Sequence, residues 1–474
     1  MAPASPALLA ELQSQLGVRG FTRDPEAMSP WLTDWRGRYR GRAAALLSPA
    51  SAAEVGEVVR RCAAAGVALV PQGGNTSMVG GATPDEGGGA LLLSLRRMRA
   101  VRSVSPEDNV AVVEAGVILA ELHEAAAAVG RRFPLSLAAK GSATVGGLVS
   151  TNAGGTQVLR FGPMRSLVLG IEAVLPDGSL IEGLSALRKD NRGYDLKQLL
   201  IGAEGTLGVV TAASLRLVAV PGSTAVAWIG LDSPHAALAL LRRLEDALGE
   251  AVESFELVPE RALRLVLAHI EGTRPPLATA ARWNVLIEAT APAGAADVRA
   301  GLESTLAAAI EAGLVQDAVI AASEAQAQAL WRLRETISEA EKHQGPAAKH
   351  DVSVPVSAMP RFIESAEAAV TGRFPGSQVV AFGHLGDGNV HFNVQPPEQV
   401  DGAAWLEARG EEVSAFVHDL ASGEGGSISA EHGIGQMKRR ELARTLAPAR
   451  LAALHALKRA LDPAGIMNPG KLLL

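Results

Sequence analysis

The chain has 474 residues, of which 48% are hydrophobic, and its formal net charge is −6. A chain of this length is too large for one ordinary core, so we expect two or three domains. The weak negative charge gives no electrostatic footprint for nucleic acid. The single cysteine, Cys62, excludes disulfides within the chain, cysteine-ligated iron–sulfur clusters and multi-cysteine zinc sites.

The first forty residues are expected to form a leader, with a short amphipathic helix followed by a tryptophan-containing segment. They contain no basic region followed by an apolar run, so no signal peptide is expected. No stretch of the chain reaches the ~18 uninterrupted apolar residues of a membrane span. These features predict a cytoplasmic enzyme.

Three glycine-dense stretches then occur within one region, at residues 71–81, 138–155 and 202–210. The first follows a predicted helix (53–65) and a predicted buried strand (67–70). Successive glycines offer backbone N–H groups to an anion with no side chain in the way. One such cluster alone is as well explained by a surface loop, but three together indicate a large phosphate-bearing ligand.

Two better-known nucleotide motifs are not supported. The sequence has no Gly-x-Gly-x-x-Gly pattern. Residues 465–472 imitate a Walker A loop, but they lack its final Ser or Thr and precede no helix of useful length.

A domain boundary is predicted at residues 221–222, because beyond it strands and helices alternate as far as residue 320. A single helix over residues 322–341 would place Arg334 and Ser338 four residues apart on one face. The next predicted strand, 347–354, places Lys349, Asp351 and Ser353 on one face. Each of these charges alone is better explained as solvated.

Residues 382–393 predict a β-hairpin around an Asp387-Gly388 turn. A two-residue turn there would set His384 opposite His391, with Asn393 on the same face. The plain interpretation is a polar hairpin with unrelated histidines, whereas an opposed pair favours a metal site. After a predicted helix (403–422), the glycine-rich loop 423–435 carries Glu431-His432, which suits either a capping loop or a ligand beside a base.

Taken together and in order, several of these motifs resemble FAD-dependent D-2-hydroxy-acid dehydrogenases of the vanillyl-alcohol oxidase/para-cresol methylhydroxylase superfamily. The branch they resemble most is D-2-hydroxyglutarate dehydrogenase, with D-lactate dehydrogenases nearby. The resemblance covers about residues 40–474, and the motifs that carry it are residues 71–76, 142–155, 204–208, 383–391, 431–433 and 468–471.

After the leader (1–40), the resemblance implies an α+β fold in three parts. These are a bipartite FAD-binding domain of the para-cresol methylhydroxylase type (41–220), a cap or substrate domain with an antiparallel sheet (221–422) and a helical segment that returns to the flavin (423–474). Some members attach FAD through a histidine in the first loop, where this chain has Asn75, so FAD is expected to be non-covalent. The implied FAD-binding residues are Pro71, Gly73, Gly74, Asn75, Thr76, Ser77, Gly80, Gly81, Ser142, Gly146, Gly147, Asn152, Gly154, Gly155, Glu204, Gly205, Gly208, Val209, Val210 and Asn468.

The resemblance also implies a divalent metal, usually zinc, held by His384, His391 and Glu431, with His432 as general base. Iron, manganese or cobalt would suit the same ligands. Substrate-binding positions are matched by Arg334, Ser338, Lys349, Asn393 and His432. Two cations favour a dicarboxylate such as D-2-hydroxyglutarate or D-malate.

Several alternatives remain at this point. The runner-up enzyme is a D-lactate or glycolate dehydrogenase, and the other classes are a metal hydrolase without redox chemistry and a non-catalytic FAD-binding subunit. An electron-transfer flavoprotein or a quinone is the expected electron acceptor by analogy, and relatives suggest a homodimer.

Overall fold

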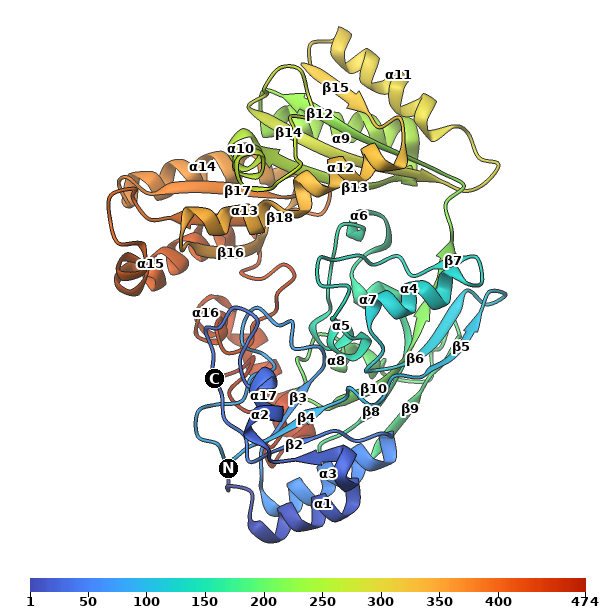
Figure 1. Cartoon of the computed structure of the whole chain (residues 1–474), viewed down its shortest axis with the longest axis vertical. Coiled ribbons are helices and arrows are strands. Elements are labelled where there is room, and N and C mark those ends of the chain that lie inside the picture. Colours follow the sequence, from blue (N-terminus) through green and yellow to red (C-terminus); the bar gives the residue numbers. More distant parts are fainter. The chain divides into compact units, whose positions relative to one another are not determined.

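A computed structural model describes all residues, 1–474, and the chain forms two compact units. The first unit contains residues 1–155, 162–220 and 431–474, and the second contains residues 156–161 and 221–430. Figure 1 shows their helices and strands along the chain. No helix has both the length and the apolar character to cross a bilayer.

The first unit is built on two main sheets. The four-stranded sheet has the order β1-β2-β4-β3, and β4 pairs in parallel with both β2 and β3. The five-stranded antiparallel sheet has the order β5-β6-β10-β8-β9, and β7 pairs with β11. The strands are β1 (Phe21–Thr22), β2 (Ala45–Leu47), β3 (Leu69–Gln72), β4 (Leu91–Ser94), β5 (Val101–Ser105), β6 (Val110–Glu114), β7 (Arg131–Arg132), β8 (Val168–Val174), β9 (Leu180–Gly183), β10 (Val209–Arg216) and β11 (Val218–Ala219).

Local sequence signals account for helix α3 of this unit. In α3, Ser51 caps the N-terminus and Gly66 ends the helix in the left-handed region. Its apolar stripe, which includes the fully buried Cys62, faces the core shared with α1. The helices are α1 (Pro6–Gly20), α2 (Pro25–Met28), α3 (Ala52–Ala65), α4 (Leu119–Ala127), α5 (Val145–Thr151), α7 (Met164–Leu167), α8 (Lys197–Leu200), α16 (Arg439–Thr445) and α17 (Pro448–Leu461).

The second unit is a seven-stranded antiparallel sheet with helices on both faces (Figure 1). Its order is β15-β12-β14-β13-β17-β18-β16, which confirms the antiparallel cap sheet that was predicted. The strands are β12 (Ser223–Leu231), β13 (Val252–Pro259), β14 (Trp283–Ala291), β15 (Asp317–Ile320), β16 (Ala348–Ser353), β17 (Gln378–His384) and β18 (Asn389–Gln395).

Alternation along the strands separates the two faces of this sheet. One face packs its apolar side chains against α9, α11, α14 and α15, and the other packs against α10, α12 and α13. The helices are α6 (Val158–Phe161), α9 (Pro234–Leu248), α10 (Glu260–His269), α11 (Val298–Glu311), α12 (Glu324–Glu335), α13 (Ile337–Ala340), α14 (Met359–Arg373) and α15 (Gly402–Gly423), with a short 3₁₀ turn η3 (Glu341–Gln344).

The predicted single helix over residues 322–341 is wrong. Helix α12 ends at Glu335, and Thr336 leaves the helical region before α13 begins. The Thr336 hydroxyl donates back to the carbonyl of Arg332 at 2.7 Å, a local bond that competes with the helix.

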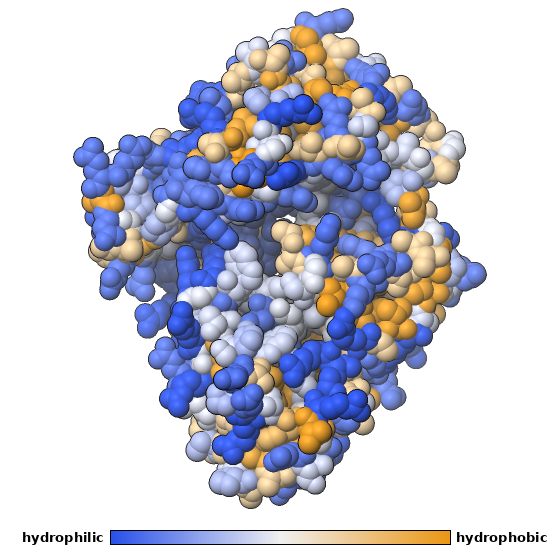
Figure 2. All heavy atoms as spheres, in the orientation of Figure 1, coloured by the Kyte–Doolittle hydropathy of each residue, from blue (hydrophilic) through white to orange (hydrophobic).

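Most of the surface in Figure 2 is hydrophilic, and hydrophobic residues appear on it in scattered groups. Large apolar side chains form the buried clusters of the two units.

Candidate functional site

The glycine loops of the first unit meet around one pocket. They come from the end of β3, the start of α5 and the approach to β10, and the C-terminal segment adds His432. The lining residues are Pro71, Gln72, Gly73, Ser77, Val79, Gly81, Ala82, Leu95, Ala115, Thr144, Gly146, Gly147, Ser150, Thr151, Glu204, Gly205, Gly208, Val209, Val210 and His432.

The pocket walls have the features that a backbone-bound nucleotide cofactor requires. A Cβ at Gly73 would lie 2.2 Å from the hydroxyl of Thr144, so only glycine fits there. The Thr144 hydroxyl and the Gln72 side-chain oxygen are buried and lack a hydrogen-bond partner. Buried polar atoms of this kind are normally satisfied, so the pocket offers polar contacts that a bound flavin nucleotide would use.

Not every expected FAD-binding residue lines this pocket. The ones outside the lining are Gly74, Asn75, Thr76, Gly80, Ser142, Asn152, Gly154, Gly155 and Asn468. Several of them shape the walls instead. The Asn75 amide donates to the carbonyls of Pro30 and Thr33, and the Asn468 amide donates to those of Gly81 and Glu204. Asn152 ends α5 in the left-handed region.

Glu204 holds the loop that carries His432. Its two carboxylate oxygens accept the backbone N–H groups of Ile434 and Gly435, each at 2.7 Å. Gly433 lies so close that a Cβ there would be 2.9 Å from Glu204 Oε1. Burial raises the pKa of Glu204, and the two backbone bonds oppose that rise. The carboxylate therefore sets the path of the backbone directly after His432.

The hairpin of the second unit forms, but its predicted register is wrong. His384 pairs with Asn389, and His391 pairs with Phe382. The turn contains four residues because the amide of Leu385 leaves the hairpin and donates to the carbonyl of Phe255 on β13. A shift of two residues keeps every side chain on its face, so the imidazoles remain diagonal neighbours with ring centroids 5.6 Å apart.

A buried carboxylate that sequence reasoning missed lies behind His384. Glu256 on β13 is 2.6 Å from His384 Nδ1 and accepts a 2.8 Å bond from Nε of Arg334. Burial alone would raise the pKa of Glu256, but the adjacent His384 and Arg334 hold it below its ordinary value. An ionised carboxylate on Nδ1 makes that nitrogen the proton carrier, so the lone pair of the neutral ring lies on Nε2, as in metal-ligating histidines.

Asp351 ties β16 to the hairpin on the same face. The amide of Asn389 donates to its carboxylate at 2.9 Å, and His391 Nδ1 lies 3.8 Å from it. Its carbonyl accepts the N–H of Ala430 at 3.2 Å. Glu431 directly follows Ala430 in the chain, so this hydrogen bond also restrains where the backbone of Glu431 can lie.

The expected substrate-binding residues behave differently from one another. Lys349 and Asn393 both contact the buried carboxylate of Glu341, at 3.1 Å and at 2.8–2.9 Å. Lys349 and Asn393 are directly paired across β16 and β18, on the face of the sheet where the sequence predicted them. Ser338 is exposed in the broken helix. Because Glu256 pairs with Arg334 and Glu341 with Lys349, both predicted cations have a buried partner of opposite charge.

Sequence reasoning missed Glu256 and Glu341. Glu256 had a readable signal, since it is one of two charged residues, with Glu253, in a strand whose other residues are mostly apolar. Glu341 had none, because it appeared as one more polar residue near the end of a helix.

Comparisons with known proteins show the family to which this chain is related. Residues 43–183 match the FAD binding domain family, and residues 220–472 match the C-terminal domain of FAD linked oxidases. The mitochondrial D-2-hydroxyglutarate dehydrogenase of Bos taurus is 39% identical over 467 residues, which are 98% of this chain and 83% of that protein. The D-2-hydroxyglutarate dehydrogenase of Xanthomonas citri pv. viticola is 38% identical over 98% of this chain and 96% of its own length.

Solved structures share the fold at lower identity. The 4-ethylphenol oxidase from Gulosibacter chungangensis superposes with a TM-score of 0.70 at 19% identity, over 100% of this chain and 99% of its own. A p-cresol methylhydroxylase structure gives 0.73 at 15% identity, over 98% and 96%. The predicted α+β fold is confirmed by these matches.

Proposed function

Because this chain belongs to the family of FAD-linked oxidases, we propose that it oxidises a D-2-hydroxy acid, with D-2-hydroxyglutarate as first choice and D-malate as second. The single observation that carries the proposal is near-full-length similarity to D-2-hydroxyglutarate dehydrogenases at 36–39% identity. The product would be the 2-oxo acid. FAD is the cofactor that the matched domain binds, and we propose that it is held without a covalent bond.

The first unit would hold FAD through the glycine loops of its pocket. Bound flavin supplies the chemistry that takes up the hydride from C2 of the substrate. The N–H groups around Gly73 would suit the pyrophosphate, whereas the N–H of Gly146 already donates to the carbonyl of Ala115 at 2.8 Å. The Thr144 hydroxyl and the Gln72 side-chain oxygen would be polar contacts inside the pocket.

A divalent metal, zinc first, would be held by His384, His391 and Glu431. A bound metal ion supplies Lewis-acid chemistry that lowers the pKa of the substrate hydroxyl. Two features support the assignment. Glu256 sets the tautomer of His384, and the bond from Ala430 to Asp351 keeps the adjacent Glu431 tied to the strand that pairs with His391.

We assign His432 as the general base that removes the proton of the 2-hydroxyl group. It lines the same pocket that would hold the flavin. Glu204 fixes the backbone directly after it, so the imidazole is carried on a restrained loop.

Arg334 and Lys349 would bind the distal carboxylate of the substrate, helped by Asn393. Arg334 uses Nε for Glu256, which leaves the two NH₂ groups of its fork as donors. Lys349 has three N–H donors, of which one points to Glu341. Ser338, which is exposed on α13, would add its hydroxyl to these groups.

Three properties stay predictions: an electron-transfer flavoprotein or a quinone as electron acceptor, a homodimer, and a cytoplasmic location. Acceptor assays on the flavin-loaded protein and light scattering would test the first two.

Anaerobic mixing with a panel of D- and L-2-hydroxy acids tests the substrate assignment. The flavin absorbance should bleach fastest with D-2-hydroxyglutarate. Faster bleaching with D-lactate or glycolate would favour those substrates, and no bleaching with any 2-hydroxy acid would end the proposal.

A further inference from the structure

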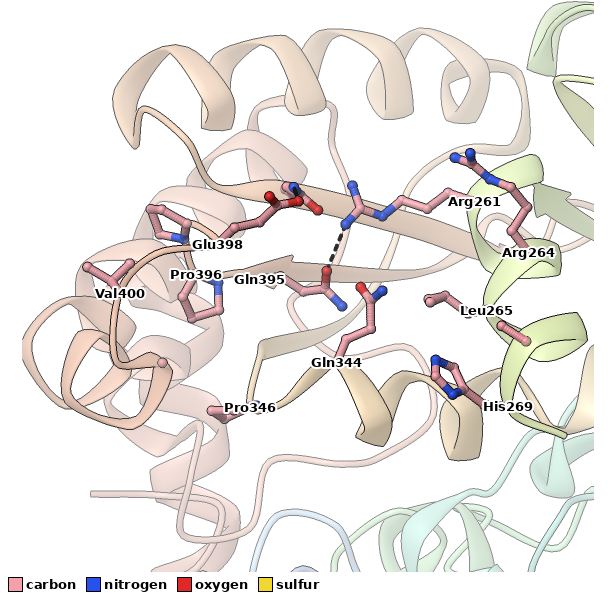
Figure 3. Close-up of a pocket in the computed structure, with 14 residues that line it drawn as sticks. Arg261, Arg264, Leu265, His269, Gln344, Pro346, Gln395, Pro396, Glu398 and Val400 are labelled. Atoms are coloured by element: carbon pink, nitrogen blue, oxygen red, sulfur yellow. Dashed lines mark hydrogen bonds between the residues drawn. The ribbon is translucent and has the colours of Figure 1, made fainter.

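A second polar cavity, of about 680 Å³, lies in the second unit between α10 and the chain that follows β18 (Figure 3). None of the residues assigned to the reaction lines it. We call it the α10–β18 cavity. Its volume is within the range of small-molecule sites, and the side chains around it carry more positive than negative charge.

Two arginines of α10 reach this cavity from one face of the helix. Arg261 and Arg264 are three residues apart, which places them side by side. Arg261 donates to the neutral side-chain oxygen of Gln395 at 3.0 Å. Arg264 has a carboxylate, that of Glu260, at 3.8 Å on an exposed surface, a contact that contributes little.

The charged groups around Arg261 are mixed in sign. Burial first, and then the nearby Arg264, lower the pKa of Arg261, while Glu367, Glu398 and Glu341 oppose the shift. Glu398 also lines the cavity and accepts a 2.8 Å bond from Gln378. Among the charged side chains that line the cavity, the two arginines outnumber the one glutamate, and Glu367 and Glu341 are outside the lining.

Gln395 adds an unused donor. The residue is 5% exposed, and its Nε2 is buried without a hydrogen-bond partner. Arg261 can only donate, so its bond to Oε1 fixes the orientation of the amide. In Figure 3 the oxygen of Gln395 faces Arg261 and its nitrogen lies on the side of Gln344. An unsatisfied buried donor costs about 1–3 kcal/mol, which an anion in the cavity would remove.

We propose that the α10–β18 cavity is a second anion site of this protein and binds a small organic carboxylate. The guanidinium forks of Arg261 and Arg264 match a planar carboxylate, and the amide of Gln395 donates to one of its oxygens. Leu265, Pro396 and Val400 provide apolar contacts for a short carbon chain.

The site is separate from the residues proposed to bind substrate, although it lies on the same strand. Gln395 is two residues beyond Asn393 on β18, about 7 Å along the strand. Glu341, which holds Lys349 and Asn393, also acts on Arg261.

Calorimetric titration of the full-length, flavin-loaded protein with succinate tests the proposal, with inorganic phosphate as a second probe. Gln395→Glu replaces the unused donor by a carboxylate that pairs with Arg261, so the fold is retained and the anion is repelled. Arg261→Gln removes the main fork. Gln328→Glu is the matched control, because Gln328 is exposed on α12.

Wild type and Gln328→Glu should bind succinate at this site with the same affinity, and in both cavity variants that affinity should fall about ten-fold or more. Equal binding by all four proteins would place succinate elsewhere and overturn the proposal. Absence of binding to wild type, or binding of phosphate without succinate, would also overturn it. Thermal unfolding without anions confirms that each variant is folded.

Discussion

Replacement of Glu204 by Gln removes one acceptor from the loop that carries His432. The carboxylate now accepts two backbone N–H groups at 2.7 Å. A Gln side chain keeps one accepting oxygen and turns an NH₂ group toward the other N–H. Loss of a charge-assisted bond costs about 1.5–3 kcal/mol, and the stranded donor adds about 1 kcal/mol. We therefore expect the variant to lose about 2.5–4 kcal/mol of unfolding free energy.

This loss would lower the melting temperature by about 2–4 °C per kcal/mol. Turnover should fall, because the loop that places His432 is no longer fixed at both positions. Differential scanning fluorimetry and steady-state assays on the flavin-loaded protein measure both effects. Glu407→Gln is the control, since Glu407 is exposed on α15. If Glu204→Gln melts and turns over like wild type, the carboxylate does not hold this loop.

Three further changes test other parts of the account. Glu256→Gln should destabilise the second unit by about 3–5 kcal/mol, because the buried Arg334 loses its partner. The same change should weaken metal binding by about 10–100-fold, as measured by chelator competition. An unchanged metal affinity would contradict the role of Glu256 behind His384. Lys349→Met should raise the KM for D-2-hydroxyglutarate more than that for D-lactate in steady-state assays; an equal change would remove Lys349 from the distal carboxylate. Cys62 is fully buried, and burial raises its pKa to about 12, so it should resist a thiol reagent at neutral pH until the protein unfolds; rapid labelling of native protein would contradict this.

Local signals were enough to predict much of the fold. The apolar spacing of α3 and the alternation of β16 each depend on residues that are neighbours in sequence. The hairpin could be predicted for the same reason. Its register could not, because the bond from Leu385 to Phe255 joins strands more than a hundred residues apart.

The candidate site shows the same division. Glycine loops and the two histidines have visible patterns, so they could be predicted. The pairing of Glu256 with His384 and Arg334, and of Glu341 with Lys349, depends on long-range packing that no local pattern encodes. The sequence showed Arg334 and Lys349 as two cations that favour a dicarboxylate, but it did not show the buried glutamates that pair with them.

Anaerobic reduction of the bound flavin by D-2-hydroxyglutarate, before and after removal of metal, tests the central claim most directly. The account predicts rapid bleaching with the D enantiomer and none with the L enantiomer. Chelation should abolish the bleaching, and added zinc should restore it. Equal bleaching in a verified metal-free protein, or bleaching by the L enantiomer alone, would contradict the account.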